Sequence, residues 1–172
     1  MVTLQKSMDA EALQELQKRS FGALLAKYLD YETNPAMESL EALRRKLAEP
    51  GREYYLIKEG ESIAGFACIK QAENSLWVTP IGLLPEHQGR GLGKEAMRAL
   101  EALYANASIW ELMTIAEEPN LCRFYEKLGY SRTGKTSVVK PGMNLVHYSK
   151  HTCKSAKKSI SKHERMKSNA DL

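Results

Sequence analysis

The sequence predicts a mixed α/β domain, and three observations support this fold class. Apolar runs that are typical of buried strands alternate with segments whose apolar residues recur at helical spacing. A turn with three glycines joins one such strand to one such helix near the middle of the chain. The 172 residues, of which 43% are hydrophobic and 27% charged, are enough to form one globular core.

Apolar patterns and turn residues divide the chain into about seven strands and about four helices. The strands are expected at residues 2–5, 53–58, 62–70, 76–84, 110–116, 131–139 and 143–150. The helices are expected to run from residues 7–9 to 28, from Asn34-Pro35 to the residues before Pro50-Gly51, from 92 to 103 and from 120 to 128. Pro80 cannot donate to a ladder, so it predicts either a sheet edge or a bulge.

The turn between residues 84 and 94 is the most informative local feature. Its glycines, in the pattern Gln88-x-x-Gly91-x-Gly93, can adopt positive φ and let the backbone approach a ligand closely. The first amides of the following helix have no intrahelical partner and carry the positive end of its dipole. We therefore expect an anion site, with a phosphate group as the usual occupant. The Lys-Ser/Thr ending of a P-loop is absent, and the glycine spacing is not that of a dinucleotide-binding fold.

A second motif follows about thirty residues later, where Asn120 precedes Phe124-Tyr125 and Gly129-Tyr130. Together the two motifs resemble the signature of the GCN5-related N-acetyltransferase (GNAT) family, and the resemblance covers most of the chain, up to about residue 150. It implies a mostly antiparallel central sheet of about seven strands flanked by about four helices, with splayed fourth and fifth strands. It also implies transfer of an acetyl group from acetyl-CoA, as co-substrate, to an amine.

The resemblance assigns the cofactor site to the glycine turn and the second motif. The amides of the turn would hold the pyrophosphate, with added charge from Arg90 and Lys94. The turn residues concerned are Gln88, Gly89, Arg90, Gly91, Leu92, Gly93 and Lys94. An amide at Leu83 or Leu84 would polarise the thioester carbonyl, in the manner of an oxyanion hole. Asn120 would contact the pantetheine arm, cap its helix, or do both.

Two catalytic groups are expected from the resemblance. Tyr125 corresponds to the family's tyrosine near the thioester sulfur, where its hydroxyl would stabilise the developing thiolate; a tyrosine that only anchors the closing hairpin is the alternative. The acceptor ammonium must lose a proton, yet residues 75–84 contain no acid, although many family members carry a base there or on the next strand. Glu111 on the next strand is the candidate base, and Glu117 or Glu118 at its end are alternatives.

The segment between the first two helices lies over the acceptor pocket in this family. Here it contains Asp30 and Glu32, which would attract a cationic substrate, and Tyr31, which would wall the pocket. His87 is interpreted as a loop residue, with a proton relay as the alternative. We expect a small-molecule amine as acceptor. A peptide amine, either a protein N-terminus or a lysine, is the alternative, as is a non-catalytic acyl-CoA-binding module.

The net charge of +4 is concentrated at the C-terminus. From Ser149 onward the chain has seven Lys/Arg and two acidic residues, so the remainder is close to neutral. We expect an acetyltransferase domain over residues 1–150 and a basic, disordered tail over residues 151–172. Nucleic-acid binding is not expected, because the tail lacks the interleaved aromatic residues that stack on bases.

The three cysteines are scattered and show no metal-ligand spacing, which predicts reduced thiols, a cytoplasmic location and no metal. No apolar run approaches the roughly 20 residues that a membrane span needs, and no signal peptide is expected, so no membrane partner is predicted. A homodimer is expected only by analogy with similar proteins.

Overall fold

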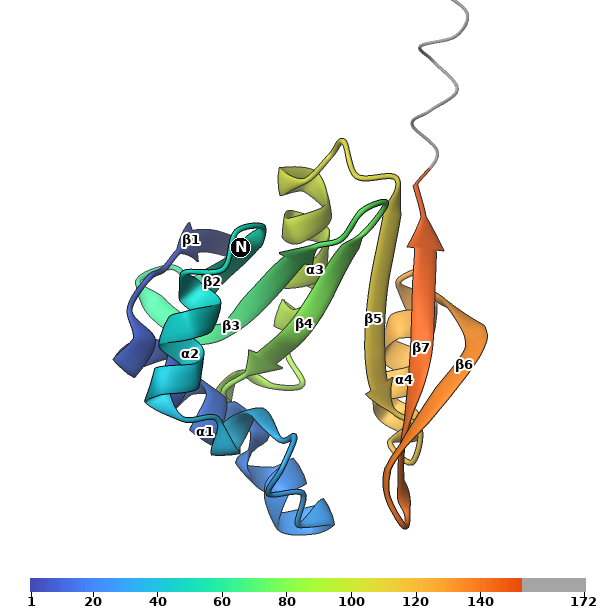
Figure 1. Cartoon of the computed structure of the whole chain (residues 1–172). Coiled ribbons are helices and arrows are strands. Elements are labelled where there is room, and N and C mark those ends of the chain that lie inside the picture. The colour runs from blue at the N-terminus through green and yellow to red at the C-terminus, as the bar shows by residue number, and fades with distance from the viewer. Residues whose placement is uncertain (153–172) are drawn as a thin grey trace, which may run out of the picture.

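The computed structural model describes residues 1–152 and shows a seven-stranded sheet with helices on both faces (Figure 1). The strands are Val2–Lys6 (β1), Arg52–Glu59 (β2), Ser62–Gln71 (β3), Leu76–Leu83 (β4), Ile109–Ile115 (β5), Ser131–Lys140 (β6) and Met143–His151 (β7). The α-helices are Ala10–Tyr28 (α1), Leu40–Leu47 (α2), Leu92–Leu103 (α3) and Pro119–Lys127 (α4), and short 3₁₀ helices cover Pro35–Met37 (η1) and Pro85–His87 (η2). The predicted mixed α/β class is confirmed.

The strand order is β1-β2-β3-β4-β5-β7-β6. All neighbouring strands are antiparallel except β4 and β5, which run parallel. Strand β7 reaches His151, which pairs with Ile109, so the first residues that we counted with the basic segment belong to the sheet. From residue 153 onward, the predicted tail lies outside the described residues.

The helix starts follow local capping chemistry, with one correction. Asp9 caps α1 as predicted, because its carboxylate accepts from the Ala12 amide. The helix predicted to start at Asn34-Pro35 is only the three-residue η1, because Glu38 is extended and interrupts it. Helix α2 begins afresh behind the Ser39 cap. In the part of the chain that the structure describes, no helix has the length and apolar character needed to cross a membrane.

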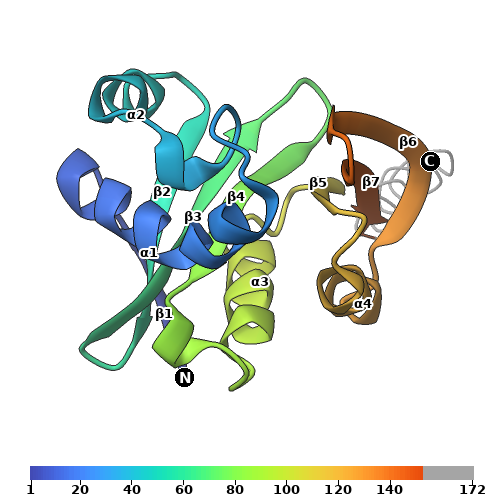
Figure 2. The ribbon, with the colours of Figure 1, turned by 90° about the horizontal axis from the view of Figure 1, so that it is seen from below.

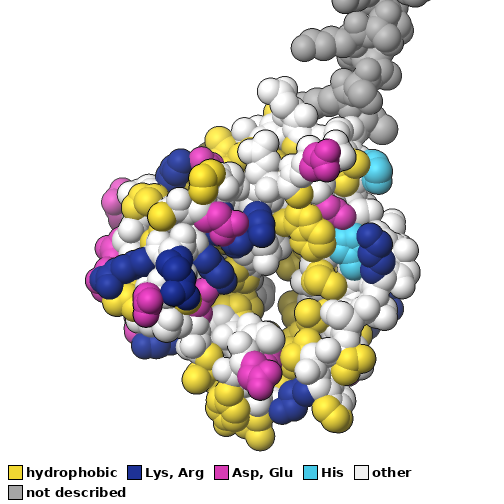
Figure 3. Space-filling model, in the orientation of Figure 1, with side chains coloured by type: hydrophobic (Ala, Val, Ile, Leu, Met, Phe, Trp, Pro, Cys, Tyr) yellow, Lys and Arg dark blue, Asp and Glu magenta, His cyan; other side chains and the backbone are white. Residues whose placement is uncertain are grey.

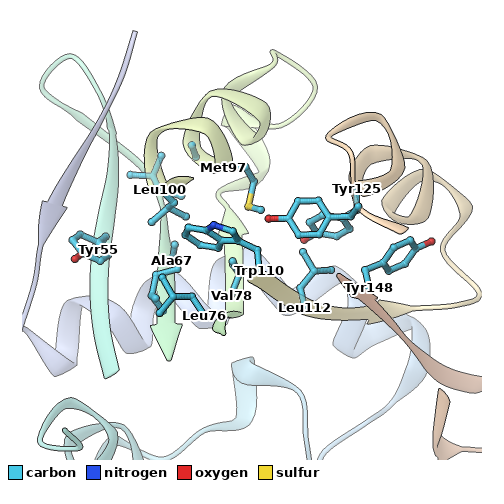
Figure 4. Packing of buried hydrophobic residues seen from close by; sticks show 14 of the residues in the cluster. Tyr55, Ala67, Leu76, Val78, Met97, Leu100, Trp110, Leu112, Tyr125 and Tyr148 are labelled. Carbon is cyan, nitrogen blue, oxygen red and sulfur yellow. The ribbon is translucent and has the colours of Figure 1, made fainter. Parts of the chain in front are cut away.

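Two apolar clusters, one on each face of the sheet, hold the helices in place. Helices α1 and α2 pack on one face around Leu13, Leu43 and Phe66. Helices α3 and α4 cover the other face, where the fully buried Trp110 lies with Leu100 in the larger cluster (Figure 4). Figure 2 shows α2 and α3 on opposite sides of strands β2 to β4.

Helix α1 crosses β4 at very close range. A Cβ on Gly82 would lie 2.8 Å from both Phe21 and Ser20 of this helix. On the neighbouring strand, a Cβ on Gly65 would lie 2.1 Å from the Gly82 carbonyl oxygen. Both positions therefore need glycine because backbone and helix approach there. This contact places α1 directly over the second half of β4.

Candidate active site

Strands β4 and β5 pair only at their beginnings, through Leu76 with Trp110 and Trp77 with Glu111. Beyond these residues the two strands diverge (Figure 1), and the space-filling view shows a hollow between them (Figure 3). We call this space the β4–β5 opening. The splay of the fourth and fifth strands that the family resemblance implied is therefore present.

Pro80 lies at the edge of this opening. The pairing of β3 with β4 changes register between the pairs Ala67–Ile81 and Ile69–Val78, so Thr79 and Pro80 lie in an irregular stretch. Since β5 no longer pairs with β4 at this point, the missing amide of Pro80 costs no ladder bond on that side. The bulge interpretation of Pro80 is confirmed.

At the end of β4, the two amides that we predicted to polarise a carbonyl point to opposite sides of the strand. The Leu84 amide donates to the Ala64 carbonyl at 2.8 Å, so the prediction for Leu84 is wrong: its N–H is already used between strands. Successive amides of a strand point in opposite directions, so the Leu83 amide faces the opening. The Leu83 carbonyl accepts from the Gln88 side chain at 3.0 Å, which anchors the glycine turn to the strand.

The turn that follows presents its backbone amides to solvent. Gly89 has φ +73° and Gly91, the N-cap residue of α3, has φ +83°. Within residues 1–152, the amides of residues 89–94 donate no hydrogen bond, and no side chain caps the helix. The positive end of a twelve-residue helix adds to these unpaired donors. This arrangement can bind a phosphate or pyrophosphate group.

The charged side chains of the turn do not all point at this anion site. Arg90 forms a two-pronged ion pair with Glu59 at the end of β2, at 2.8 and 3.0 Å. The His87 Nδ1 lies 3.4 Å from the same carboxylate, so His87 belongs to this surface cluster. Lys94 is exposed and forms no ion pair within the described residues. Of the two predicted side chains, Lys94 is therefore the better placed to add charge at the turn.

The third glycine connects the two sequence motifs. A Cβ on Gly93 would lie 3.3 Å from the Phe124 ring and 3.7 Å from Leu83. Phe124 thus packs against the first turn of α3, and its neighbour Tyr125 packs at a ring distance of 5.0 Å from it. The two motifs meet although about thirty residues separate them in the sequence.

Tyr125 comes from α4 and is buried in the cluster beneath α3. Its ring lies on the side of the cluster formed by Met97 and Leu112 (Figure 4) and also packs against Tyr130. Burial raises the pKa of Tyr125 to about 12. Its hydroxyl makes no hydrogen bond to any described residue, so it is available to a ligand as a protonated donor.

Asn120 does not play the capping role that we predicted. Helix α4 begins at Pro119 behind Glu118, because proline is well suited to the first helical position. Asn120 therefore lies inside the first turn, exposed, and its side-chain oxygen accepts from Arg123 at 2.6 Å. A contact with a pantetheine arm remains a proposal.

The candidate base Glu111 projects from the sheet face opposite Trp110, on the side of α1 and α2. Its carboxylate accepts from the Ser75 hydroxyl. Its other oxygen lies 3.1 Å from His147 Nε2, although the His147 N–H does not point along this line. Glu111 is 20% exposed and His147 is 4% exposed, so the pair is nearly closed off from solvent.

The two alternative acids are committed to other contacts. Glu117 accepts from the amide and the side chain of Asn144, and these hydrogen bonds lower its pKa. Glu118 accepts from Lys27 and Tyr28 of α1, each at 2.6 Å. Both acids therefore hold neighbouring segments together, and Glu111 is likewise engaged by Ser75 and His147.

The loop after α1 places its three predicted residues differently. The Asp30 carboxylate is buried and accepts from the Glu32 and Thr33 amides and from the Thr33 hydroxyl, so it shapes the loop. Tyr31 and Glu32 are exposed. Only these two can meet an incoming acceptor without a rearrangement of the loop.

Sequence reasoning missed His147 and the role of Trp77. The two rings stack with centroids 5.1 Å apart, and the Thr133 hydroxyl contacts His147 Nδ1. Alternation along β7 could have placed His147 opposite the core residues Val146 and Tyr148. No local signal could have shown that it meets Glu111 of another strand.

The splayed strands, the unpaired amide turn and the buried tyrosine define an acyltransferase fold. The chain belongs to the acetyltransferase (GNAT) family, whose model matches residues 10–130. It is 25% identical over 134 residues to the uncharacterized protein YrkN of Bacillus subtilis, covering 76% of this chain and 72% of that protein. It is 28% identical over 97 residues to the N-alpha-acetyltransferase RimI of Mycobacterium tuberculosis, covering 54% of this chain and 61% of RimI.

Solved structures share the fold. The Paia N-acetyltransferase of Thermoplasma acidophilum, in complex with coenzyme A, has a TM-score of 0.70 at 16% identity, covering 88% of this chain and 99% of that chain. The spermidine N-acetyltransferase of Vibrio cholerae, in complex with CoA and spermine, has a TM-score of 0.66 at 18% identity, covering 86% of this chain and 94% of that chain. At these identities the similarity establishes the fold.

Proposed function

We propose that this protein is a cytoplasmic, acetyl-CoA-dependent N-acetyltransferase that acetylates the primary amine of a small molecule in a ternary complex. The observation that carries the proposal is the row of unpaired amides at residues 89–94, in the turn that follows β4 and packs through Gly93 against Phe124, the neighbour of Tyr125. A pyrophosphate on these amides would lead the pantetheine arm along the free edge of β4, much as an added strand would lie. Asn120 lies in the first turn of α4 and would border this arm.

The reaction needs one bond to form and one to break. The amine nitrogen attacks the thioester carbonyl carbon, and the carbon–sulfur bond then breaks to release the CoA thiolate. The Leu83 amide is six residues along β4 from Trp77, the partner of Glu111, which is roughly 20 Å, so it would donate to the pantetheine arm and not to the reacting carbonyl. The Tyr125 hydroxyl would donate to the sulfur. Because its pKa of about 12 lies well above that of an ordinary thiol, it would act mainly through a hydrogen bond that strengthens in the transition state.

The acceptor must arrive as a free amine, although an alkylammonium has a pKa near 10. We propose that Glu111 removes this proton, directly or through water, from the face of the sheet opposite the cofactor turn. Helix α1 packs on this face at Gly82, and the exposed Tyr31 lies in the loop that follows this helix. Helix α1 and its loop would then set which acceptors can enter.

Acetylation of a protein N-terminus or lysine is the second candidate. It is favoured by the match to RimI and by the exposed apolar side chains around the loop after α1. These are Leu29, Tyr31 and Met37, with exposed fractions of 52%, 59% and 47%. A non-catalytic acyl-CoA-binding module would keep the cofactor site and lack turnover with every amine.

Thermal unfolding with acetyl-CoA, CoA and ATP tests the cofactor site. A ligand at about 100 times its dissociation constant adds roughly 2.7 kcal/mol, which corresponds to a midpoint rise of about 5–10 °C for a domain of this size. We expect such a rise with acetyl-CoA and CoA and little with ATP. Thiol release with small amines and with peptides then separates the two acceptor classes. No rise at millimolar acetyl-CoA would contradict the proposed function.

A further inference from the structure

Four side chains form one line across the sheet, on the face that carries α1 and α2. The strand registers pair Arg52 of β2 with Lys70 of β3, Lys70 with Trp77 of β4, and Trp77 with Glu111 of β5. Cross-strand partners project from the same face of a sheet, so these side chains are successive neighbours. Two cations therefore lie on one side of Trp77, and one acid lies on the other.

The cationic side of the line borders a recess. Arg52, Lys70, Trp77, Ala72 and Thr79 line this recess, and Thr79 lies where β4 and β5 have already separated. The recess thus adjoins the β4–β5 opening on the acceptor face. In Figure 3, dark-blue and magenta side chains lie together on one side of the upper part of the hollow, and cyan, magenta and dark-blue side chains lie together on the other.

The charges in the recess leave a net positive site. Arg52 is held by its Nε at 2.8 Å from Glu49, and its side chain is only 9% exposed. Lys70 Nζ lies 3.7 Å from the other oxygen of Glu49. A hydrogen bond from Arg52 lowers the pKa of Glu49, so this acid is ionised and offsets one of the two cations. Among the described residues, the Arg52–Lys70 end of the line, with Glu49 counted, therefore has one net positive charge.

The acidic side of the line contains a buried group without a hydrogen bond. His147 stacks on Trp77, and its Nε2 is fully buried, 3.1 Å from Glu111, yet makes no hydrogen bond. Unpaired buried nitrogens are uncommon in folded proteins because they lose solvation. Glu111, which is 20% exposed, is the member of this pair that a polar group next to the opening could reach.

We infer that the acceptor amine carries an anionic group, which binds at Arg52 and Lys70 while the amine lies near Glu111. This inference rests on the proposed function and names its acceptor class. Two strand spacings separate Lys70 from Glu111, so the amine and the anionic group are roughly 10 Å apart or less. The apolar part between them lies over Trp77. A second cationic group on the acceptor is disfavoured, because it would meet the two cations at the far end.

A matched acceptor panel tests the inference. Aminohexanoate and aminohexylphosphonate carry a carboxylate or phosphonate at the far end, hexylamine carries no charge there, and diaminohexane carries a cation. We expect kcat/KM for an anionic acceptor to exceed that for hexylamine by roughly fivefold to tenfold. Diaminohexane is expected to be the poorest acceptor. Comparison of aminohexanoate with aminohexylphosphonate shows whether the site prefers a carboxylate or a phosphate-like group.

Variants identify the recess as the source of this preference. Lys70→Met is expected to remove most of the advantage of the anionic acceptor, measured as the ratio of its kcat/KM to that of hexylamine in the same variant. Lys58→Met, near the opposite end of β2 from Arg52, is the matched control and should keep the preference. The double variant Lys70→Met with Arg52→Gln should abolish the preference for an anionic acceptor. The thermal midpoint of the double variant shows whether it folds. If it does not fold, Lys70→Met alone tests the inference.

Binding to the CoA-loaded protein, measured by calorimetry, keeps the test independent of turnover. Aminohexanoate should bind more tightly than hexylamine by roughly fivefold to tenfold, the factor expected for kcat/KM. Equal kcat/KM or equal affinity for the anionic and neutral acceptors, within about twofold, would overturn the inference while the proposed function stands. Loss of the acetyl-CoA thermal shift would instead contradict the proposed function itself.

Discussion

Tyr125 is buried, and its hydroxyl makes no hydrogen bond to a described residue. Its pKa of about 12 keeps it protonated over the physiological range, so removing the hydroxyl removes a donor and no charge. Tyr125→Phe is therefore expected to lower kcat by about 10²-fold, with little change in the KM for acetyl-CoA or in the thermal midpoint. Steady-state kinetics with thiol detection measure this. A variant that keeps more than half of the wild-type kcat would rule out the proposed role.

Glu53 makes the stability depend on acidic pH. It accepts hydrogen bonds from Lys6, Tyr104 and Tyr55, and these lower its pKa from 4.5 to about 2. Since the folded pKa lies below the unfolded one, the stabilisation is present above pH 4.5 and is lost as the pH falls toward 2. Urea midpoints should show a deficit in Glu53→Gln at pH 7 that shrinks markedly at pH 3. An equal deficit at both pH values would contradict this assignment.

At the scale of elements, the turn before α3 depends on the backbone conformation of Gly91. A Cβ at this position would touch nothing within 4 Å, so the cost of Gly91→Ala comes from its φ of +83° alone. We expect a loss of about 1–2 kcal/mol in stability and a weaker thermal shift with CoA, because the amides move. Titration calorimetry with CoA checks the second effect. Unchanged CoA affinity would mean that the turn is not the phosphate site.

The contact of α1 with β4 predicts opposite effects for two glycines. Gly82→Ala forces a Cβ against Ser20 and Phe21 and should destabilise the fold by about 1–3 kcal/mol. Gly22→Ala, inside α1 with open space around it, should stabilise the protein by about 0.5–1 kcal/mol. Denaturant unfolding of both variants is the measurement. Similar effects in the two variants would show that α1 does not lie tightly over β4.

For the molecule as a whole, side-chain hydrogen bonds join the parts on either side of the β4–β5 opening. Glu118, at the start of α4, binds Lys27 and Tyr28 at the end of α1, and Lys140 of β6 donates to the Leu29 carbonyl at 3.2 Å. Leu29 has φ +53°, so its backbone is held in an uncommon conformation at this junction. The acceptor side of the opening is thus bounded by segments far apart in the sequence.

Breaking this junction should change the binding of the acceptor and leave the binding of the cofactor unchanged. Glu118→Gln is expected to raise hydrogen exchange at residues 24–32 and to change the acceptor KM, while the KM for acetyl-CoA stays the same. The change in stability should stay below about 1 kcal/mol because the pair is partly exposed. Glu41→Gln, which removes an exposed ion pair on α2, is the control. Unchanged exchange at residues 24–32 would contradict the junction.

Features that depend on neighbouring residues could be predicted from the amino-acid sequence. Helical spacing and capping predicted α1, α3 and α4 to within one or two residues, and turn chemistry predicted the β6–β7 hairpin around Pro141-Gly142. The glycine turn was recognisable because positive φ and free helix-terminal amides are local properties. The family resemblance joined these pieces into one fold.

Which side chains meet depends on the three-dimensional fold. Arg90 turns to Glu59, the Leu84 amide bonds to Ala64, and Glu111 lies beside His147, each across a large separation in the sequence. The line from Arg52 through Trp77 to Glu111 exists only because four strands adopt one register. Register is set by how whole faces of the sheet pack, and no short stretch of residues contains that information.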